Sequence, residues 1–443
     1  MADIAPFPAI RFNSAKVPLN QVVTQPYDKI SAEMQERYYA ANPHNLVRII
    51  LGKQEAGDSD VENVYTRAAG YFRDWQHAGI FRTDSQPGFY LYTQTFRVPG
   101  TGASGESSQV ERTGLIAAGR IYDYSEGVVY RHEQTLSKPK ADRLNLLRAT
   151  RAHFGQIFML YSDPAGRVNS LLKSAAGSGA GSGAPDIEIE DEYQVVHRVW
   201  SIFDPAIVPQ VQREMADKRL IIADGHHRYE TALNYRNERR ANAGSAPPDA
   251  AYERVMMTLV NMDSPGLIIL PTHRVIFGLS EFSEADFLQG AKSFFDVETL
   301  SPGDAGEDKL RQAGQAGTVF LAVTKQATHL LRARPGAADS LLAGMSAAQR
   351  SLDVVHLHKV LLERVLGISE EAIRNQLHVS YHRDFRKAIA RVGDGANLAM
   401  MMNPVRISQL REVTFEGGVL PQKSTDFYPK MLSGLTIYSV GGE

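Results

Sequence analysis

The stretch RLIIADGHHRYETA, residues 219–232, decides how the middle of the chain is interpreted. After its first residue, the run 219–223 is apolar, which predicts a buried strand. Asp224-Gly225 follows as a turn, and residues 228–240 have the composition of a helix. The order of strand, turn and helix places the residues of the turn at a helix N-terminus.

The turn from Asp224 to Arg228 offers groups that suit a phosphate. A helix N-terminus presents backbone N–H groups and a partial positive charge. Gly225 lets the backbone approach a ligand closely, and Arg228 can form a bidentate pair with phosphate oxygens. His226 or His227 can move a proton or carry charge near neutral pH. The alternative is a structural turn, in which Asp224 caps the helix and the histidines face solvent.

A second group of candidates lies upstream, in EGVVYRHEQTLSKPKADR at 126–143. Lysine and arginine can neutralise a polyphosphate, whereas a carboxylate can bind Mg²⁺ or act as a general base. The candidates are His132, Glu133, Lys138, Lys140 and Arg143. Because 137–152 is predicted to be a helix, the competing interpretation is a solvated charged helix face.

A third group interrupts the apolar stretch LIILPTHRVIF, 267–277, which is predicted to be one strand following the strand 255–262. Its polar trio, Thr272, His273 and Arg274, either lines a pocket or marks a strand edge, and we favour the pocket. Two weaker signals remain. The first is Pro26-Tyr27-Asp28, which is typical of a turn. The second is the stretch QKST at 422–425 with Pro429-Lys430, which could reach a phosphate or belong to a surface loop.

Composition limits the class of protein. The 443 residues are 43% apolar, carry a formal charge of -2 and include no cysteine. The absence of cysteine excludes disulfides, thiolate metal sites and cysteine nucleophiles. The balanced charge gives no sign of a nucleic-acid partner. The sequence shows neither a signal peptide nor a membrane-spanning run, so we expect a cytoplasmic protein. A homo-oligomer is compatible with the sequence.

The order of elements predicts an α+β fold of mixed α/β character. Strands are expected at 46–51, 89–98, 112–121, 154–161 and 318–333 (a hairpin), and a helix at 58–79. The Gly/Ala/Ser-rich stretch 174–185 is expected to be a flexible insertion. We therefore expect an N-terminal α/β segment, 1–110, packed on a phosphate-binding core, 111–280, and a C-terminal α+β region, 281–443.

Several motifs together resemble the family known as domain of unknown function 1015. They are Pro26-Tyr27-Asp28, the block 126–143 followed by LRATR at 147–151, IADGHHRYETAL, LPTHR and PQKSTDFYPK at 421–430. The DGHHR turn alone is also similar to the phosphate-binding turn of the ParB/sulfiredoxin-like superfamily. That superfamily includes free-serine kinases, whose turn has the form DGH-x-R. Sulfiredoxin chemistry needs a cysteine in this turn, so that branch is excluded.

The second resemblance implies a ParB/sulfiredoxin-like core, ATP or ADP as donor, Mg²⁺ and a small hydroxyl-bearing acceptor such as serine. It leads to a phosphotransferase or phosphohydrolase acting on serine or phosphoserine. Glu133 or Asp224 would hold Mg²⁺ or accept a proton, and Lys138, Lys140 and Arg143 would bind nucleotide phosphates. Two alternatives stay open: a nucleotide-sensing regulator without catalysis, and a DNA-partition protein, which the near-neutral charge disfavours.

Overall fold

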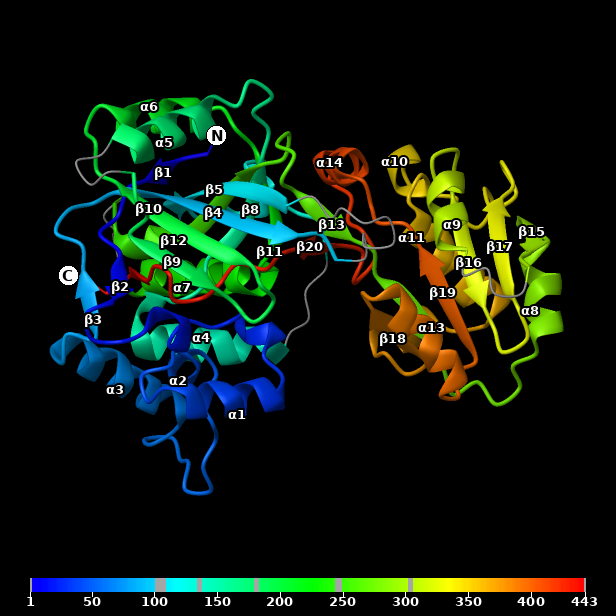
Figure 1. The fold of residues 1–443 in the computed structure, drawn as a ribbon, viewed down its shortest axis with the longest axis horizontal. Coiled ribbons are helices and arrows are strands. Elements are labelled where there is room, and N and C mark those ends of the chain that lie inside the picture. The colour runs from blue at the N-terminus through cyan, green and yellow to red at the C-terminus, as the bar shows by residue number, and fades with distance from the viewer. Residues whose placement is uncertain are drawn as a thin grey trace.

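The computed structural model describes residues 2–99, 109–133, 138–178, 183–243, 249–301 and 306–441. It contains both helices and sheets, as predicted, arranged around two larger sheets (Figure 1). In the described residues, no helix combines the length and the apolar character that a membrane span requires.

The larger sheet is mixed, with parallel and antiparallel pairs. Its described strands run in the order β6 (Val129–Arg131), β11 (Leu220–Asp224), β8 (Ile157–Tyr161), β12 (Arg254–Asn261), β5 (Gln109–Arg120), β4 (Phe89–Arg97), β10 (Val196–Ile202) and β9 (Ile187–Glu190), and β1 (Ile4–Ala5) pairs with β5. The strands predicted near 89, 112, 154, 219 and 255 are therefore confirmed. Most of their side chains are buried on both faces because helices cover the sheet on both sides.

Helices form a layer on each face of this sheet (Figure 1). One layer holds α5 (Arg167–Ser178) and α6 (Ile207–Met215); the other holds α1 (Ala32–Ala41), α2 (Val47–Ile50), α3 (Val64–His77), α4 (Lys138–Thr150) and α7 (His226–Ala243). In α3, Ala68, Phe72 and Trp75 are buried on one stripe. The side chain of Asn63 accepts hydrogen bonds from the first-turn amides, so the helix begins at Val64 rather than near 58.

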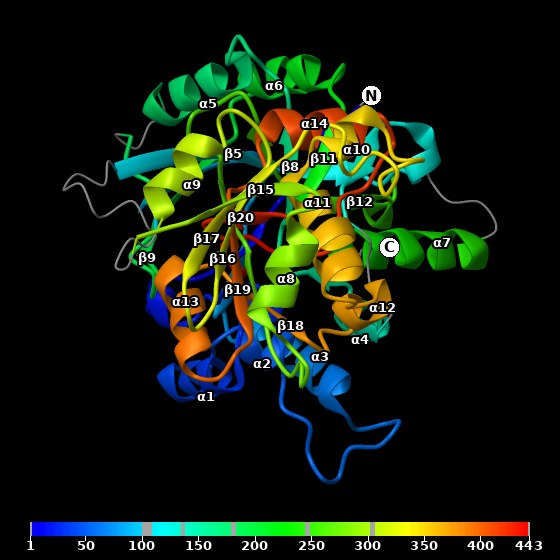
Figure 2. The ribbon, with the colours of Figure 1, turned by 90° about the vertical axis from the view of Figure 1, so that its right-hand side faces the viewer.

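The second sheet has its own helices on both faces (Figure 2). Its strands run in the order β15 (Phe295–Thr299), β17 (Thr328–Ala333), β16 (Val319–Val323), β19 (Leu398–Met402), β14 (His273–Ile276) and β18 (Val379–His382). One face packs against α9 (Glu307–Ala313) and α13 (Phe385–Gly393), and the other against α8 (Glu284–Ala291), α11 (Asp353–His356) and a π-helix, Leu357–Val365. Further helices are α10 (Ala347–Arg350), α12 (Glu370–Arg374) and α14 (Ile407–Phe415). The predicted hairpin at 318–333 is β16–β17.

The C-terminal segment returns from the second sheet to the larger body. Strand β20 (Asp426–Tyr428) pairs with β13 (Ile268–Leu270), and β21 (Tyr438–Ser439) pairs with β7 (Ala152–His153). Between them Ile437 is fully buried and bonds through its backbone to Ile10 in β2 (Ile10–Phe12), which pairs with β3 (Phe81–Thr83). The first and last parts of the chain thus share one core.

Two predicted strands are wrong. Residues 46–51 contain helix α2, because the Asn45 side chain accepts a hydrogen bond from the amide of Val47 and starts a helical turn. A short apolar run that is fully buried suits either structure. The stretch 267–277 splits into β13 and β14, which belong to different sheets. Pro271 lies at the break, where its missing N–H cannot continue a ladder.

The predicted flexible insertion, 174–185, also differs in part. Residues 174–178 form the last turns of α5, which the alanines favour. Residues 179–182 lie outside the described part of the chain. Whether 1–110, 111–280 and 281–443 fold as separate units stays a prediction, although the larger sheet takes strands from the first two segments.

The turn between β12 and β13 passes close to β5 at Gly266. A Cβ atom at this position would lie 2.7 Å from the Cα of Arg112 and against the backbone of Glu111, which a strand in the middle of a sheet cannot move cheaply. We expect Gly266→Ala to lower the free energy of unfolding by about 1–3 kcal/mol, measured by urea denaturation. Gly57→Ala, where a Cβ meets nothing within 4 Å, is the control. Equal midpoints for the two variants would contradict the predicted close approach.

Candidate functional site

A polar cavity of about 540 Å³ lies where the turn after β11 meets the C-terminal segment and the end of β18. Its volume falls in the range of small-molecule sites. The charged groups that line it are the carboxylates Asp28, Glu133, Asp224 and Asp426 and the cations Lys29, Arg228, Arg383, Lys423 and Lys430. Tyrosine, threonine and histidine side chains complete the wall: Tyr27, Tyr193, Tyr381, Thr272, Thr425, His226, His227 and His382.

The predicted turn at 224–228 forms one wall of the cavity. Helix α7 begins at His226, directly after Gly225, whose φ of 92° lies in the region that glycine adopts without strain. Arg228 turns back toward the protein. It donates to the Asp224 carboxylate (2.8 Å) and to the backbone carbonyl of Gln156. Part of its hydrogen-bonding capacity is therefore already used within the fold.

Asp224 is paired with two cations of the cavity. Besides Arg228, it accepts a hydrogen bond from the Lys430 ammonium at 3.2 Å. Burial alone would raise the pKa of Asp224, but the nearby charges of Lys430, Arg228 and Lys29 outweigh it and hold that pKa well below its usual range. Burial lowers the pKa of Lys430, and Asp224 and Asp426 raise it above its ordinary value. The pair is thus ionised at neutral pH.

His226, on the cavity wall, and His132, beneath it, lie side by side, with ring centroids 4.8 Å apart. His132, at the end of β6, is fully buried, and its Nδ1 lies 2.6 Å from the carbonyl oxygen of Ile222. Its Nε2 lies 2.8 Å from the hydroxyl of Thr425. Burial lowers the pKa of His132, and burial together with His132 lowers the pKa of His226 further. Both rings are therefore neutral at physiological pH.

Two buried arginines hold the C-terminal segment in place through its backbone. Arg112 donates to the carbonyls of Tyr428 (3.1 Å) and Pro429 (2.5 Å), and Arg274 donates to that of Lys423 (3.1 Å). Within the described residues neither guanidinium has a carboxylate partner at salt-bridge distance. Burial lowers the pKa of each to about 10, so both stay charged at neutral pH.

Among the residues that the structure describes, Lys29 and Lys423 are the lysine or arginine side chains of the cavity that remain available. Across the described ranges, neither ammonium group has a hydrogen bond or an ion pair. Burial, and then the charge of Lys430, lower the pKa of Lys29, and the nearby carboxylates, Asp426 first, offset this only in part. The backbone of Lys423 has a φ of 58°, a left-handed conformation that is uncommon outside glycine and clusters at functional sites.

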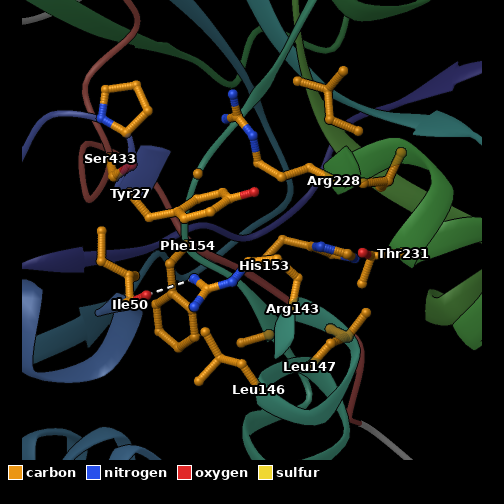
Figure 3. Close-up of a pocket in the computed structure, with 15 residues that line it drawn as sticks. Tyr27, Ile50, Arg143, Leu146, Leu147, His153, Phe154, Arg228, Thr231 and Ser433 are labelled. Carbon is orange, nitrogen blue, oxygen red and sulfur yellow. Dashed lines mark hydrogen bonds between the residues drawn. The ribbon is translucent and has the colours of Figure 1, made fainter. Parts of the chain in front are cut away.

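A smaller pocket of about 70 Å³ lies behind Tyr27 and Arg228 (Figure 3). It is mostly apolar, with Leu146, Leu147 and Phe154 among its walls. The predicted phosphate ligand Arg143 is placed here rather than in the polar cavity. Its guanidinium donates to the carbonyl of Ile50 and lies 4.2 Å from the centre of the Tyr27 ring.

The structure thus gathers part of the predicted site. Of the candidate residues, the cavity is lined by Glu133, Asp224, Gly225, His226, His227, Arg228 and Thr272. His132 lies beneath it, and Arg143, His273 and Arg274 point elsewhere; His273 is buried, with its pKa lowered by burial to about 4. The side chains of Lys138 and Lys140 lie outside the described part of the chain. In that part, there is no group of three acidic or histidine side chains that could hold a metal by itself.

The sequence analysis gave too little weight to the two cavity walls that come from the beginning and the end of the chain. Asp28 and Lys29 come from the turn after Pro26, and Lys423, Thr425 and Lys430 from the stretch 421–430. Asp28, Lys423, Thr425 and Lys430 belong to motifs that carry the family resemblance, whereas the sequence analysis did not single out Lys29. Their chemistry was hidden because a turn near the N-terminus and a loop near the C-terminus look like surface segments until the fold brings them together.

The comparisons with known proteins place the chain in a family. The model described as "Protein of unknown function (DUF1015)" matches residues 4–355, and the chain belongs to that family. No curated protein matches the chain.

Solved structures resemble the chain only weakly. A mutant free serine kinase in complex with ADP has a TM-score of 0.35 at 10% identity, over 73% of this chain and 92% of that one. A conserved hypothetical protein from Pyrococcus furiosus has 0.34 at 10%, over 73% and 94%. SbnI with a C-terminal truncation, from Staphylococcus aureus, has 0.33 at 9%, over 69% and 82%. Similarity at this level carries no argument about the fold or chemistry of this chain.

The Asp224–Lys430 pair generates a prediction about stability. Replacing Lys430 with Met leaves a partly buried carboxylate with Arg228 alone, and we expect a loss of about 3 kcal/mol in the free energy of unfolding. Lys430→Arg should recover most of it. Lys53→Met is the control, because Lys53 pairs with Glu36 at the surface and should cost less than about 1 kcal/mol. A Lys430→Met variant as stable as Lys53→Met would refute the role of the pair.

The depressed pKa of Asp224 generates a second prediction. Because the folded-state pKa lies below the ordinary value of 3.8, Asp224 stabilises the fold above that value, and the contribution is lost as the pH falls below it. We expect the stability difference between wild type and Asp224→Asn to be constant near neutral pH and to shrink progressively below about pH 4. Urea denaturation at a series of pH values measures it. A difference that is unchanged under acidic conditions would contradict the assignment.

Proposed function

We propose that the polar cavity is the active site of a phosphotransferase or phosphohydrolase that uses a nucleotide and acts on serine or phosphoserine. The observation that carries this proposal is a pair of lysines, Lys29 and Lys423, that have no partner among the described residues and lie at a cavity whose wall includes the N-terminus of α7. A helix N-terminus and two available ammonium groups suit phosphate oxygens.

The residue types of the cavity suit phosphoryl transfer, which needs positioning and charge neutralisation more than covalent chemistry. Lys29, Lys423 and the first turn of α7 would hold the phosphates, with Gly225 allowing their close approach. Glu133 would accept the proton of an acceptor hydroxyl, because its carboxylate lines the cavity and has no ion pair with a lysine or arginine in the described residues.

Magnesium fits this arrangement only together with a phosphorylated ligand. Mg²⁺ is commonly bound by one or two carboxylates plus substrate phosphates and water. Glu133 would supply such a carboxylate. Asp224 is a weaker choice than the sequence indicated, because Arg228 and Lys430 already neutralise it. When bound, the ion would neutralise charge on the phosphates.

Serine as the acceptor rests on the DGH-x-R form of the turn, and ATP or ADP as the donor rests on the same resemblance.

A regulator that binds nucleotide without turnover is the second candidate, favoured by the number of cavity cations that are committed to internal ion pairs. Turnover distinguishes the two, because a regulator would bind nucleotide and release little product.

The test is phosphorus NMR of the purified protein with Mg²⁺ and ATP or ADP plus serine, and separately with phosphoserine. We expect phosphoserine from the first mixture or free phosphate from the second. Lys29→Met and Lys423→Met should each lower kcat/KM about tenfold or more, the equivalent of about 1.4 kcal/mol of transition-state stabilisation.

Lys359→Met is the matched control for these variants. Lys359, on the π-helix, pairs with Glu363 of the same helix and with Glu370 of α12, and it does not line the cavity. It should keep wild-type activity. If no phosphorus signal changes in any mixture, the serine chemistry is wrong; nucleotide binding that persists in the wild type and is lost in Lys423→Met would then support the regulator.

A further inference from the structure

One hydroxyl group of the cavity wall is hydrogen-bonded to a buried imidazole. Thr425 lines the cavity, and its Oγ1 lies 2.8 Å from Nε2 of His132. The next acceptor near this hydroxyl is a Glu133 carboxylate oxygen at 3.4 Å, at the outer limit of a hydrogen bond. The hydroxyl of Thr299, in β15, also lies close to a histidine, 3.0 Å from Nδ1 of His329, but Thr299 does not line the cavity, so it offers a matched comparison.

The surroundings of His132 fix which nitrogen accepts. The carbonyl oxygen of Ile222 can only accept, so Nδ1, 2.6 Å away, must carry a hydrogen. The ring is buried and neutral, so Nε2 has a free lone pair. Thr425 therefore donates its hydroxyl hydrogen to Nε2. This is the arrangement of a nucleophile, a base and an orienting group, with a backbone carbonyl as the orienting group.

Thr425 is also held rigidly beside groups that attract phosphate. It directly precedes β20, which pairs with β13, and Arg274 fixes the carbonyl of Lys423 two residues earlier. The ammonium group of Lys423 lines the same cavity. A hydroxyl group on a mobile loop would lose positional precision, whereas this one is fixed from both sides.

We propose that Thr425 is a phosphoryl acceptor of this protein, with His132 as its general base. The inference rests on the proposed phosphoryl chemistry and adds a covalent step to it. The Thr425 oxygen forms a bond to phosphorus of a phosphoanhydride or phosphomonoester donor. The bond from that phosphorus to the leaving oxygen breaks, and the leaving group keeps the electron pair. The hydroxyl proton moves to Nε2 of His132, giving a phosphothreonine.

The same wall explains why the phosphothreonine would be transient. The Glu133 carboxylate lies close to Thr425, and repulsion between it and a phosphate dianion raises the free energy of the modified protein. His132, protonated by the first step, can return its proton to the threonine oxygen as the phosphoryl group passes to water or to an acceptor hydroxyl. The second transfer restores the starting state of both residues.

The experiment follows the label on the full-length protein. Wild type is mixed with Mg²⁺ and γ-³²P-labelled ATP, and separately with ³²P-phosphoserine, quenched with acid at times from milliseconds to minutes, and mapped by peptide mass spectrometry. We expect one phosphoryl group per chain, on Thr425. Thr425→Ser should keep the label, Thr425→Val should lose it, and Thr299→Val should be labelled like wild type. His132→Gln should slow labelling about a hundredfold.

The outcomes separate this inference from the proposed function. If phosphorus NMR shows product, but wild type is not labelled at any time and Thr425→Val turns over at the wild-type rate, the covalent step is wrong and the function stands. A label on any other residue also overturns it. If neither product nor label forms, the function and the inference fail together. Circular dichroism of Thr425→Val checks that a lost label does not reflect a lost fold.

Discussion

The ion pair between Asp224 and Lys430 is the constraint on which the cavity depends. It joins the end of β11, in the larger sheet, to a segment that the chain reaches 206 residues later. Both side chains are largely buried, so removing either one would leave the other, in a region of low dielectric, with a single ion-pair partner among the described residues: Arg228 for Asp224, or Asp426 for Lys430. Lys430 in turn pairs with Asp426 at 3.3 Å. The turn that sequence reasoning selected therefore has its geometry only when the C-terminal segment is in place.

The cations around the cavity divide into two kinds. Arg112 and Arg274 are fully enclosed. Arg112 donates to the backbone of the C-terminal segment and to the side chain of Gln94, and Arg274 donates to the same segment and to the carbonyl of Thr272. Arg228 and Lys430 form ion pairs with carboxylates. Burying a guanidinium without a carboxylate is costly, and the cost is offset here by several carbonyl acceptors in fixed positions. These residues fix the shape of the cavity. Because they hold the C-terminal segment in place, the charges of Lys29 and Lys423 stay available for a ligand.

This division also explains how much of the site the sequence could predict. The turn at 224–228 could be predicted because its strand, glycine and helix follow one another in the sequence. The local sequence pattern therefore determines this part of the structure. The prediction that Arg143 binds phosphate did not identify its partners, because a charged residue in a sequence does not show where its side chain points. In the fold its guanidinium packs on Tyr27 and donates to the carbonyl of Ile50. Thr272 and Arg274 are two residues apart, yet one reaches the cavity and the other lies behind it. The paired residues Thr425 and His132 are 293 residues apart in the chain, so no local pattern contains them.

The charge balance of the cavity points to the kind of ligand it can select. Four carboxylates and five lysine or arginine side chains line it among the described residues, and burial lowers the pKa of His226 and His382, which keeps these histidines neutral. The summed field is therefore weak, in keeping with a whole chain of formal charge -2. A long polyanion is recruited by an extended positive field, which this arrangement does not offer. A compact anion responds instead to the positions of a few charges within hydrogen-bonding reach. Most of the cations of the cavity are already paired, so the positions of Lys29, Lys423 and the amides of α7 determine which ligands fit. The cavity can therefore select a ligand by its shape rather than by its charge alone.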